Sequence, residues 1–192
     1  MSDRKIIMGI DPGTNCTGYG FLEVTRGVPR TVVMGYIELN KLRDPYEKLR
    51  HIFVRVAALI DEYSPDEVAL ESPFFGENVQ SMLKLGRAQG VAMAAALTRG
   101  VSVFEYAPRL VKQVITGNGA ASKQQVARLL QAMLKIEYDL KRLDATDGLA
   151  VALCHHLRSS SLLPNDTVKP KGKRKKESWE SFVAANPQRI KL

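Results

Sequence analysis

The first 39 residues contain three consecutive runs of strand-forming residues, and these runs constrain the fold more than any other feature of the sequence. Lys5 to Ile10 is a nearly continuous apolar run, which is typical of a strand buried on both faces. A turn rich in Pro and Gly, residues 11–18, separates it from a second run, and Thr31 to Leu39 forms the third. Because the connections are short, we expect the three strands to form an antiparallel meander.

Helical and strand patterns alternate along the rest of the domain. Asp44 with Glu47, and Ser122 with Gln125, have the spacing of a capping box, which predicts the starts of two helices. The elements predicted after the third strand are helix 45–62, strand 67–72, helix 79–99, strand 101–107, a short helix opened by Pro108, helix 122–135 and helix 144–156. This order predicts an α/β fold with a mixed five-stranded sheet flanked by helices.

The composition is that of a globular protein, with 45% hydrophobic and 25% charged residues, so a core can be buried. The longest apolar stretch, residues 91–97, is far shorter than the ~18 residues that a membrane span needs. The amino terminus leads into a short apolar run without the pattern of a signal peptide. Two cysteines, Cys16 and Cys154, form neither a disulfide framework nor a zinc motif. We therefore expect a cytoplasmic protein with no membrane partner.

The positive charge is concentrated near the carboxyl terminus. The chain carries a formal charge of +8, and residues 169–192 hold eight of its basic and two of its acidic side chains. We expect a folded domain, residues 1–160, followed by a basic, disordered tail, residues 161–192. Such a tail can neutralise nucleic-acid phosphates without reading sequence. The alternative is a solubility tail without a specific partner.

Four acidic residues lie at strand ends or on one helix face, where they could take part in catalysis or metal binding. Asp11 directly follows the first strand, and Glu71 ends the strand predicted at 67–72. Asp144 and Asp147 lie three residues apart and so share one face of the last helix. Ligands in open α/β sheets gather at the carboxyl ends of strands, so Asp11 and Glu71 would share an edge if their strands are neighbours.

Carboxylates brought together in this way repel one another unless cations intervene. Oxygen ligands without a Cys or His cluster favour Mg²⁺ or Mn²⁺ over zinc, and a pair of such ions ~4 Å apart can cleave a phosphodiester. Each acid alone also has an ordinary explanation. Asp11 could cap a turn, Glu71 could be solvated, and the Asp144 and Asp147 pair could complement a helix dipole.

Four segments together resemble the RuvC family of Holliday-junction resolvases. They are IIMGIDPGTNCTGYG, ALESPF, FEYAPRLVKQVITGNGAASKQQV and LDATDGLAVAL, in register from about Ile6 to His156. The resemblance implies a ribonuclease-H-like fold and a homodimer that acts on four-way DNA junctions in recombination and repair. It places the family's four catalytic acids on Asp11, Glu71, Asp144 and Asp147.

The mechanism that the resemblance implies is hydrolysis assisted by two Mg²⁺ ions per subunit, with Mn²⁺ as a substitute. It leaves 5′-phosphate and 3′-hydroxyl ends and forms no covalent protein intermediate. Paired nicks follow from symmetry, because an isologous dimer presents two identical sites to an approximately two-fold symmetric junction. The family also works with a junction-binding and branch-migration motor of the RuvA and RuvB type.

The DNA contacts come from the resemblance as well. Lys112 and Lys123 fall where the family places basic residues near the cleaved strand, and Phe74 falls where it places a stacking aromatic. Phe75 could share or take that role, because both lie in the loop after Glu71. Lys123 also follows the expected cap Ser122, so its charge and the helix amides could hold one phosphate. Ordinary surface lysines and core phenylalanines are the alternatives.

Several other residues receive structural interpretations. His51, His155 and His156 lack the spacing of metal ligands, and Cys16 is expected to have no redox role. The small residues of helix 79–99 allow close approach of a partner subunit, and we expect this helix to lie near the dimer surface, although core packing is the more common cause of such residues.

Competing functions remain at this stage. The string GIDPGTNCTGYG is also similar to the first phosphate loop of actin- and hexokinase-like ATPases, but 192 residues are too few for their second domain. A non-catalytic protein that binds branched DNA, or a nuclease of the same fold with another substrate, is a further possibility.

Overall fold

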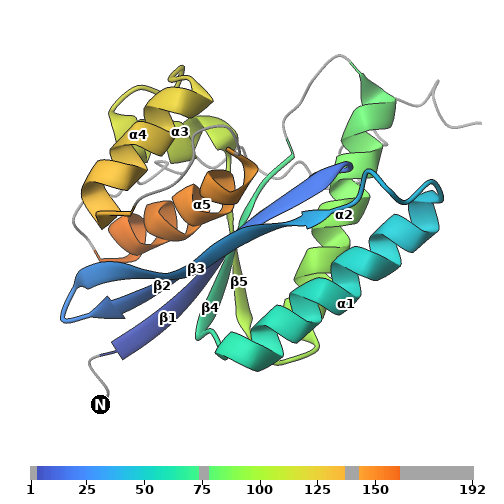
Figure 1. Ribbon diagram of the computed structural model, residues 1–192, viewed down its shortest axis with the longest axis horizontal. Coiled ribbons are helices and arrows are strands. Elements are labelled where there is room, and N and C mark those ends of the chain that lie inside the picture. The colour runs from blue at the N-terminus through green and yellow to red at the C-terminus, as the bar shows by residue number, and fades with distance from the viewer. Residues whose placement is uncertain (1–3, 74–77, 137–142, 161–192) are drawn as a thin grey trace, which may run out of the picture.

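The computed structural model describes residues 4–73, 78–136 and 143–160, which form one sheet and the helices on its two faces (Figure 1). The strands are β1 (Arg4–Asp11), β2 (Cys16–Thr25), β3 (Val28–Glu38), β4 (Glu67–Glu71) and β5 (Ser102–Tyr106). The helices are α1 (Pro45–Tyr63), α2 (Val79–Leu97), α3 (Pro108–Thr116), α4 (Lys123–Leu134) and α5 (Asp144–Ser159). None of these helices is long and apolar enough to cross a membrane. The basic segment 161–192 lies outside the described residues.

The sheet has the order β3-β2-β1-β4-β5. β1 pairs antiparallel with β2, and β2 pairs antiparallel with β3, which confirms the predicted meander. β4 lies parallel to β1 on its other side, and β5 lies parallel to β4. The prediction of a mixed five-stranded sheet is therefore confirmed.

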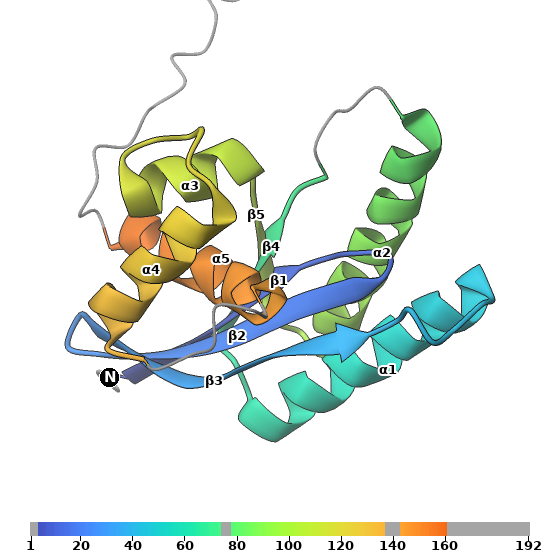
Figure 2. The ribbon, with the colours of Figure 1, turned by 45° about the horizontal axis from the view of Figure 1, so that its top comes forward.

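The central strand β1 is covered on both faces because its side chains alternate between two cores. Ile7 is fully buried in the core beneath α3, α4 and α5, whereas Met8 and Ile10 are fully buried in the core beneath α1 and α2. Figure 2 shows these two helical layers on opposite sides of the sheet. Burial of β1 on both faces of the sheet therefore explains why its sequence is a nearly continuous apolar run.

The helix starts follow the predicted caps, with one correction. Ser122 and Gln125 form a complete capping box at the start of α4. At the start of α1 the Asp44 side chain accepts a hydrogen bond from the Glu47 amide, but the Glu47 carboxylate turns to Arg50 instead of back to the cap. A nearby guanidinium competes successfully for that carboxylate because it offers a charge-assisted hydrogen bond. The reciprocal half of this second box was therefore wrongly predicted.

Helix α5 packs against β1 and β2 at very short range because glycines line the contact. A Cβ added at Gly9 would lie 2.1 Å from the Gly148 carbonyl oxygen, and one added at Gly148 would lie 2.5 Å from the Tyr19 Cα. Gly18 and Gly20 leave equally little space, with the nearest atoms 2.0 Å and 2.7 Å away. No side chain fits at these positions. The helix that carries Asp144 and Asp147 is thereby seated directly on the backbone of the sheet.

The small residues of α2 serve packing within the domain on one face of the helix. Ala88, Ala92, Ala95 and Ala96 are buried in the core that α1 and α2 share above the sheet. Gly86 and Gly90 lie on the opposite side, where an added Cβ would meet nothing within 4 Å. The alanines are therefore explained by this core, and the expectation of a subunit contact along α2 stays a prediction.

A buried hydrogen-bond chain crosses the edge of the sheet between β4 and β5. His155 is 2% exposed, its Nε2 lies 2.5 Å from the Glu67 carboxylate, and its Nδ1 lies 2.7 Å from the Tyr106 hydroxyl. Because the carboxylate can only accept, Nε2 carries the proton and the Tyr106 hydroxyl donates to Nδ1. Lys5 also pairs with Glu67, and these contacts lower the pKa of Glu67 although burial alone would raise it. The structural interpretation of His155 agrees with these contacts.

His155→Ala is expected to cost about 3 kcal/mol of unfolding free energy, because it opens a cavity and removes the hydrogen-bond partner of the partly buried Tyr106 hydroxyl and one partner of Glu67. Urea denaturation measures the loss. His51→Ala, at a partly exposed position on α1, serves as the control and is expected to change stability by less than about 0.5 kcal/mol. Equal effects of the two substitutions would contradict the structural role of His155.

Candidate active site

The acids of β1 and β4 lie side by side at one edge of the sheet. β1 and β4 are parallel neighbours with Ile10 opposite Leu70, so Asp11 and Glu71 each follow directly at the carboxyl ends of adjacent strands. This confirms that the two predicted strand ends share an edge. Both carboxylates are partly buried.

The first turn of α5 brings the other two acids to the same place. A hollow of about 440 Å³ is lined by Asp11, Glu71 and Asp144, together with Lys123. A smaller adjoining cleft, of about 110 Å³, is lined by Asp11, Glu71, Lys123 and Asp147. We call these two spaces together the acidic hollow. All four predicted acids therefore border one continuous region, although they come from three separate parts of the chain.

Burial and crowding raise the pKa values of Asp11, Glu71 and Asp147. Burial, reinforced by the Asp147 and Asp144 carboxylates, raises the pKa of Asp11 to about 7. Burial and the Asp11 carboxylate raise the pKa of Glu71 to about 8. Burial also raises the pKa of Asp147, despite the opposing effect of Lys123. At neutral pH Asp11 and Glu71 therefore keep part of their protons, and full ionisation of the acids requires added positive charge.

Lys123 supplies part of the missing positive charge. Its Nζ lies 2.5 Å from Asp147 Oδ2 and so donates a charge-assisted hydrogen bond to that carboxylate. Burial alone would lower the pKa of Lys123, but Asp147, Asp11 and Asp144 outweigh it and raise the pKa. Lys112 lines the same cleft. Both predicted lysines therefore lie beside the acids, and Phe74 and Phe75 lie outside the described residues.

Cys16 was not predicted to belong to this region, yet it lines the acidic hollow. Burial, together with the charge of the adjacent Asp144 carboxylate and a hydrogen bond to it, raises the pKa of the Cys16 thiol to about 12. The group therefore stays a protonated thiol that donates to Asp144, and such a thiol is a poor nucleophile. The only sign of this in the sequence is that Cys16 closely follows Asp11, at the end of the same turn.

The acids have the chemistry of a divalent-cation site. Their donors are hard carboxylate oxygens, and their mutual repulsion is relieved by added positive charge. Within residues 4–73, 78–136 and 143–160, no three Asp, Glu, His or Cys side chains already form a closed metal site. Lys123 instead holds Asp147. The residues fit Mg²⁺ or Mn²⁺ in donor type and charge. For Asp147 to bind the ion, its hydrogen bond with Lys123 must break.

The raised pKa of Asp11 predicts how stability depends on pH in the metal-free protein. A carboxyl whose pKa rises from 3.8 to about 7 on folding binds its proton more tightly in the native state, so stability falls as the pH rises between these values. Asp11→Asn removes this cost. We expect the variant to match the original protein at pH 4 and to melt about 5 °C higher at pH 8 in the presence of a chelator. Thermal unfolding followed by circular dichroism tests this, and an equal difference at both pH values would contradict it.

The fold is that of the ribonuclease-H-like resolvases, because the solved structures that it matches include RuvC proteins. A family model described as crossover junction endodeoxyribonuclease RuvC matches residues 7–155. The chain belongs to this family.

Relatives and solved structures agree with this assignment. Crossover junction endodeoxyribonucleases RuvC of Porphyromonas gingivalis and Bacteroides fragilis are 52% and 53% identical to the chain, over 98% of its length and 98% and 97% of theirs. The structure of Thermus thermophilus RuvC in complex with a Holliday junction substrate superposes with a TM-score of 0.73. It is 29% identical, and the match covers 81% of this chain and 94% of that one.

Proposed function

We propose that the protein resolves four-way DNA junctions by cutting two opposing strands hydrolytically. The observation that carries the proposal is that Asp11, Glu71, Asp144 and Asp147 border a single hollow. Membership of a family of crossover junction endodeoxyribonucleases supports the reaction, and the Thermus thermophilus complex supports the substrate. Cuts of this kind complete recombination and repair.

The four acids are the proposed ligands of Mg²⁺, two ions per subunit, with Mn²⁺ as a substitute. When bound, such ions activate a water for attack on phosphorus and stabilise the departing 3′ oxygen, which leaves 5′-phosphate and 3′-hydroxyl ends. Asp11 is the proposed shared ligand. Asp11 and Glu71 both border the two parts of the hollow, but only Asp11 ends the central strand β1. Glu71 faces it from β4, and Asp144 and Asp147 complete the set from α5.

The two lysines have a role that changes when substrate arrives. Lys123 holds Asp147 in the free protein. If bound cations neutralised the acids, the Lys123 ammonium would be free to donate to a phosphate oxygen of the cleaved strand, with the first amides of α4 beside it. Lys112 approaches the same strand from α3. Of the aromatics, Phe74 or Phe75 is the proposed stacking residue near the crossover.

The proposed assembly is a homodimer. A four-way junction is approximately two-fold symmetric, so two identical sites can cut equivalent strands and leave ligatable duplexes. A junction-binding and branch-migration motor of the RuvA and RuvB type is the proposed partner. The proposed nuclease domain is residues 1–160. The remaining basic segment, residues 161–192, is proposed to bind DNA without reading sequence. Because the substrate is chromosomal DNA, the proposed location is the cytoplasm.

One assay tests the proposal. A mobile four-way junction and a matched linear duplex, both end-labelled, are incubated with the protein and Mg²⁺, Mn²⁺ or a chelator. Symmetric cuts in the junction alone, lost with chelator and sealed by ligase, are expected. Junction binding without any cut would identify a non-catalytic branched-DNA protein, and cuts in other branched or RNA-containing substrates would redefine the substrate. ATP binding by calorimetry would favour the actin- and hexokinase-like alternative, which the family match over residues 7–155 does not support.

A further inference from the structure

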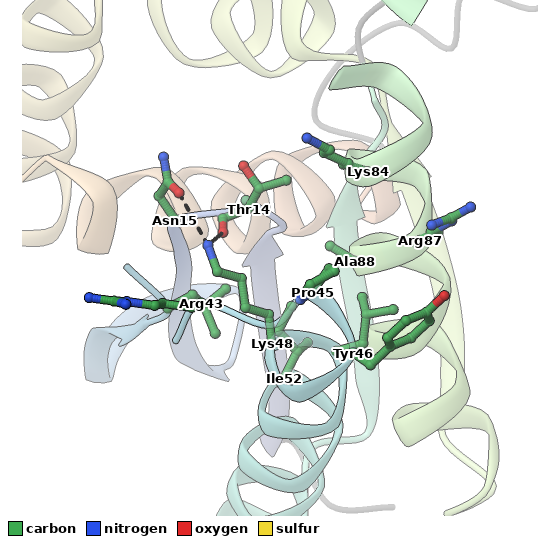
Figure 3. A pocket seen from close by; sticks show the side chains of 13 residues that line it. Thr14, Asn15, Arg43, Pro45, Tyr46, Lys48, Ile52, Lys84, Arg87 and Ala88 are labelled. Atoms are coloured by element: carbon green, nitrogen blue, oxygen red, sulfur yellow. Dashed lines mark hydrogen bonds between the residues drawn. The ribbon is translucent and has the colours of Figure 1, made fainter. Parts of the chain in front are cut away.

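A second hollow lies next to the acidic one. It encloses about 270 Å³ between the first turns of α1, the middle of α2 and the turn at residues 13–15 that follows β1 (Figure 3). Gly13, Thr14 and Asn15 line both spaces, so the second hollow continues directly from the first. None of the proposed catalytic residues borders it.

The charge of this second hollow is opposite to that of its neighbour. Four cationic side chains line it, and no Asp or Glu is among the described residues that do so. The four are Arg43, Lys48, Lys84 and Arg87. We call this space the basic hollow. In the described part of the chain no carboxylate pairs with Arg43, Lys84 or Arg87, so their charge is available to a ligand.

Lys48 connects the two hollows. Its Nζ donates to the Thr14 carbonyl oxygen at 2.9 Å and to Asn15 Oδ1 at 3.4 Å, and an ammonium has three protons, so one remains for a ligand. Figure 3 shows Lys48 reaching this turn from α1 and Lys84 approaching it from α2, while Arg43 and Arg87 extend outward on opposite sides. The cations thus form a row that passes the turn rather than a closed pocket for a small anion.

Tyr46 adds an aromatic surface to the row. It sits in the first turn of α1, lines the basic hollow and is 72% exposed. Cations that follow a phosphate backbone, with an exposed aromatic ring beside them, are the combination that proteins use for single strands and unpaired junction regions.

We propose that the basic hollow holds the sugar-phosphate backbone of the DNA strand immediately beside the cleaved phosphate. This inference rests on the proposed function, which brings a DNA strand into the acidic hollow. A DNA strand that leaves the acidic hollow across the turn at residues 13–15 would enter the basic hollow next. The two hollows therefore form one continuous path, negatively charged at the cleaved phosphate and positively charged beside it. The carboxyl-terminal segment 169–192 is a poor occupant, because it carries eight basic and two acidic residues.

The test compares full-length variants that each remove positive charge. Lys84→Gln and the double variant Lys84→Gln/Arg87→Gln alter the basic hollow. Arg55→Gln is the matched control, because it removes one charge from an exposed position on α1 that does not line the hollow. Binding of a fluorescent four-way junction is followed by anisotropy in chelator, where no cutting occurs, over a range of salt concentrations.

We expect Lys84→Gln to raise the Kd about fivefold to tenfold and the double variant to raise it further. The slope of log Kd against log salt should fall by about 1 for each phosphate contact removed, equally for junctions of different sequence. Arg55→Gln should stay within about twofold.

Two results would overturn the inference. One is binding by Lys84→Gln and the double variant that equals that of Arg55→Gln. The other is a change of oligomeric state in light scattering, which would make the hollow an interface between copies of the chain. Failure of the proposed function looks different, because the unaltered protein would then not cut the junction in Mg²⁺, whether or not it binds it.

Discussion

Asp11→Asn protein is expected to bind a four-way junction almost as tightly as the unaltered protein and to cut it at least about a thousandfold more slowly. Asn keeps the shape of the side chain but removes the charge that a cation needs. Asp11 has the most central position among the acids, at the end of β1 and on both parts of the acidic hollow. A loss of this size corresponds to about 4 kcal/mol of transition-state stabilisation.

Binding should survive because phosphate contacts made by lysines supply most of the affinity. Relief of crowding by the substitution even favours a nearby phosphate. The measurement is single-turnover cleavage at saturating protein, alongside junction binding in chelator. Glu62→Gln, an exposed acid on α1, is the control and should cut at the original rate. Full-rate cutting by Asp11→Asn would remove this acid from the catalytic set.

Gly148→Ala is expected to cost about 3 kcal/mol or more of unfolding free energy and to abolish cutting. The added methyl group would lie 2.5 Å from the Tyr19 Cα, and strand backbone cannot yield as a flexible side chain does. Helix α5 must therefore move away from β2, and Asp144 and Asp147 move with it. Denaturant titration measures the stability, and the junction assay measures the activity.

The matched control for this substitution is Gly86→Ala. Gly86 also lies within a helix, but an added Cβ there would meet nothing within 4 Å. Alanine is the better helix former, so this variant should gain about 0.5–1 kcal/mol. If Gly148→Ala were as stable and active as Gly86→Ala, close packing of α5 on the sheet would not be what positions its acids.

Local patterns in the sequence predicted the strands of a mixed sheet, and they predicted a shared edge for Asp11 and Glu71 on the condition that their strands are neighbours, which the pairing of β1 with β4 meets. The apolar runs identified the strands, and their carboxyl ends identified Asp11 and Glu71. The three-residue spacing of Asp144 and Asp147 placed that pair on one helix face, but no local pattern indicates which part of the sheet this face approaches. The end of α5 was also predicted too early, at His156 instead of Ser159, because no residue before Ser160 forces a helix to stop.

Contacts between distant segments could not be predicted. Lys48 holds a carbonyl 34 residues earlier in the chain, and Lys123 holds a carboxylate 24 residues later. Each lysine taken alone is indistinguishable in the sequence from a solvated surface charge. Only the packing of α1 and α4 around the strand ends gives these two side chains their partners.

Three of the four acids that surround the hollow are encoded at the two ends of the folded domain, with Asp11 on the first strand and Asp144 and Asp147 on the last helix. During translation, the nascent chain contains Asp11 and Glu71 long before Asp144 and Asp147 have been added. A fragment produced by premature termination, or by proteolytic removal of α5, also lacks Asp144 and Asp147. Because such chains lack two of the four proposed metal ligands, we expect them not to cut DNA until α5 has been made and has folded onto the sheet.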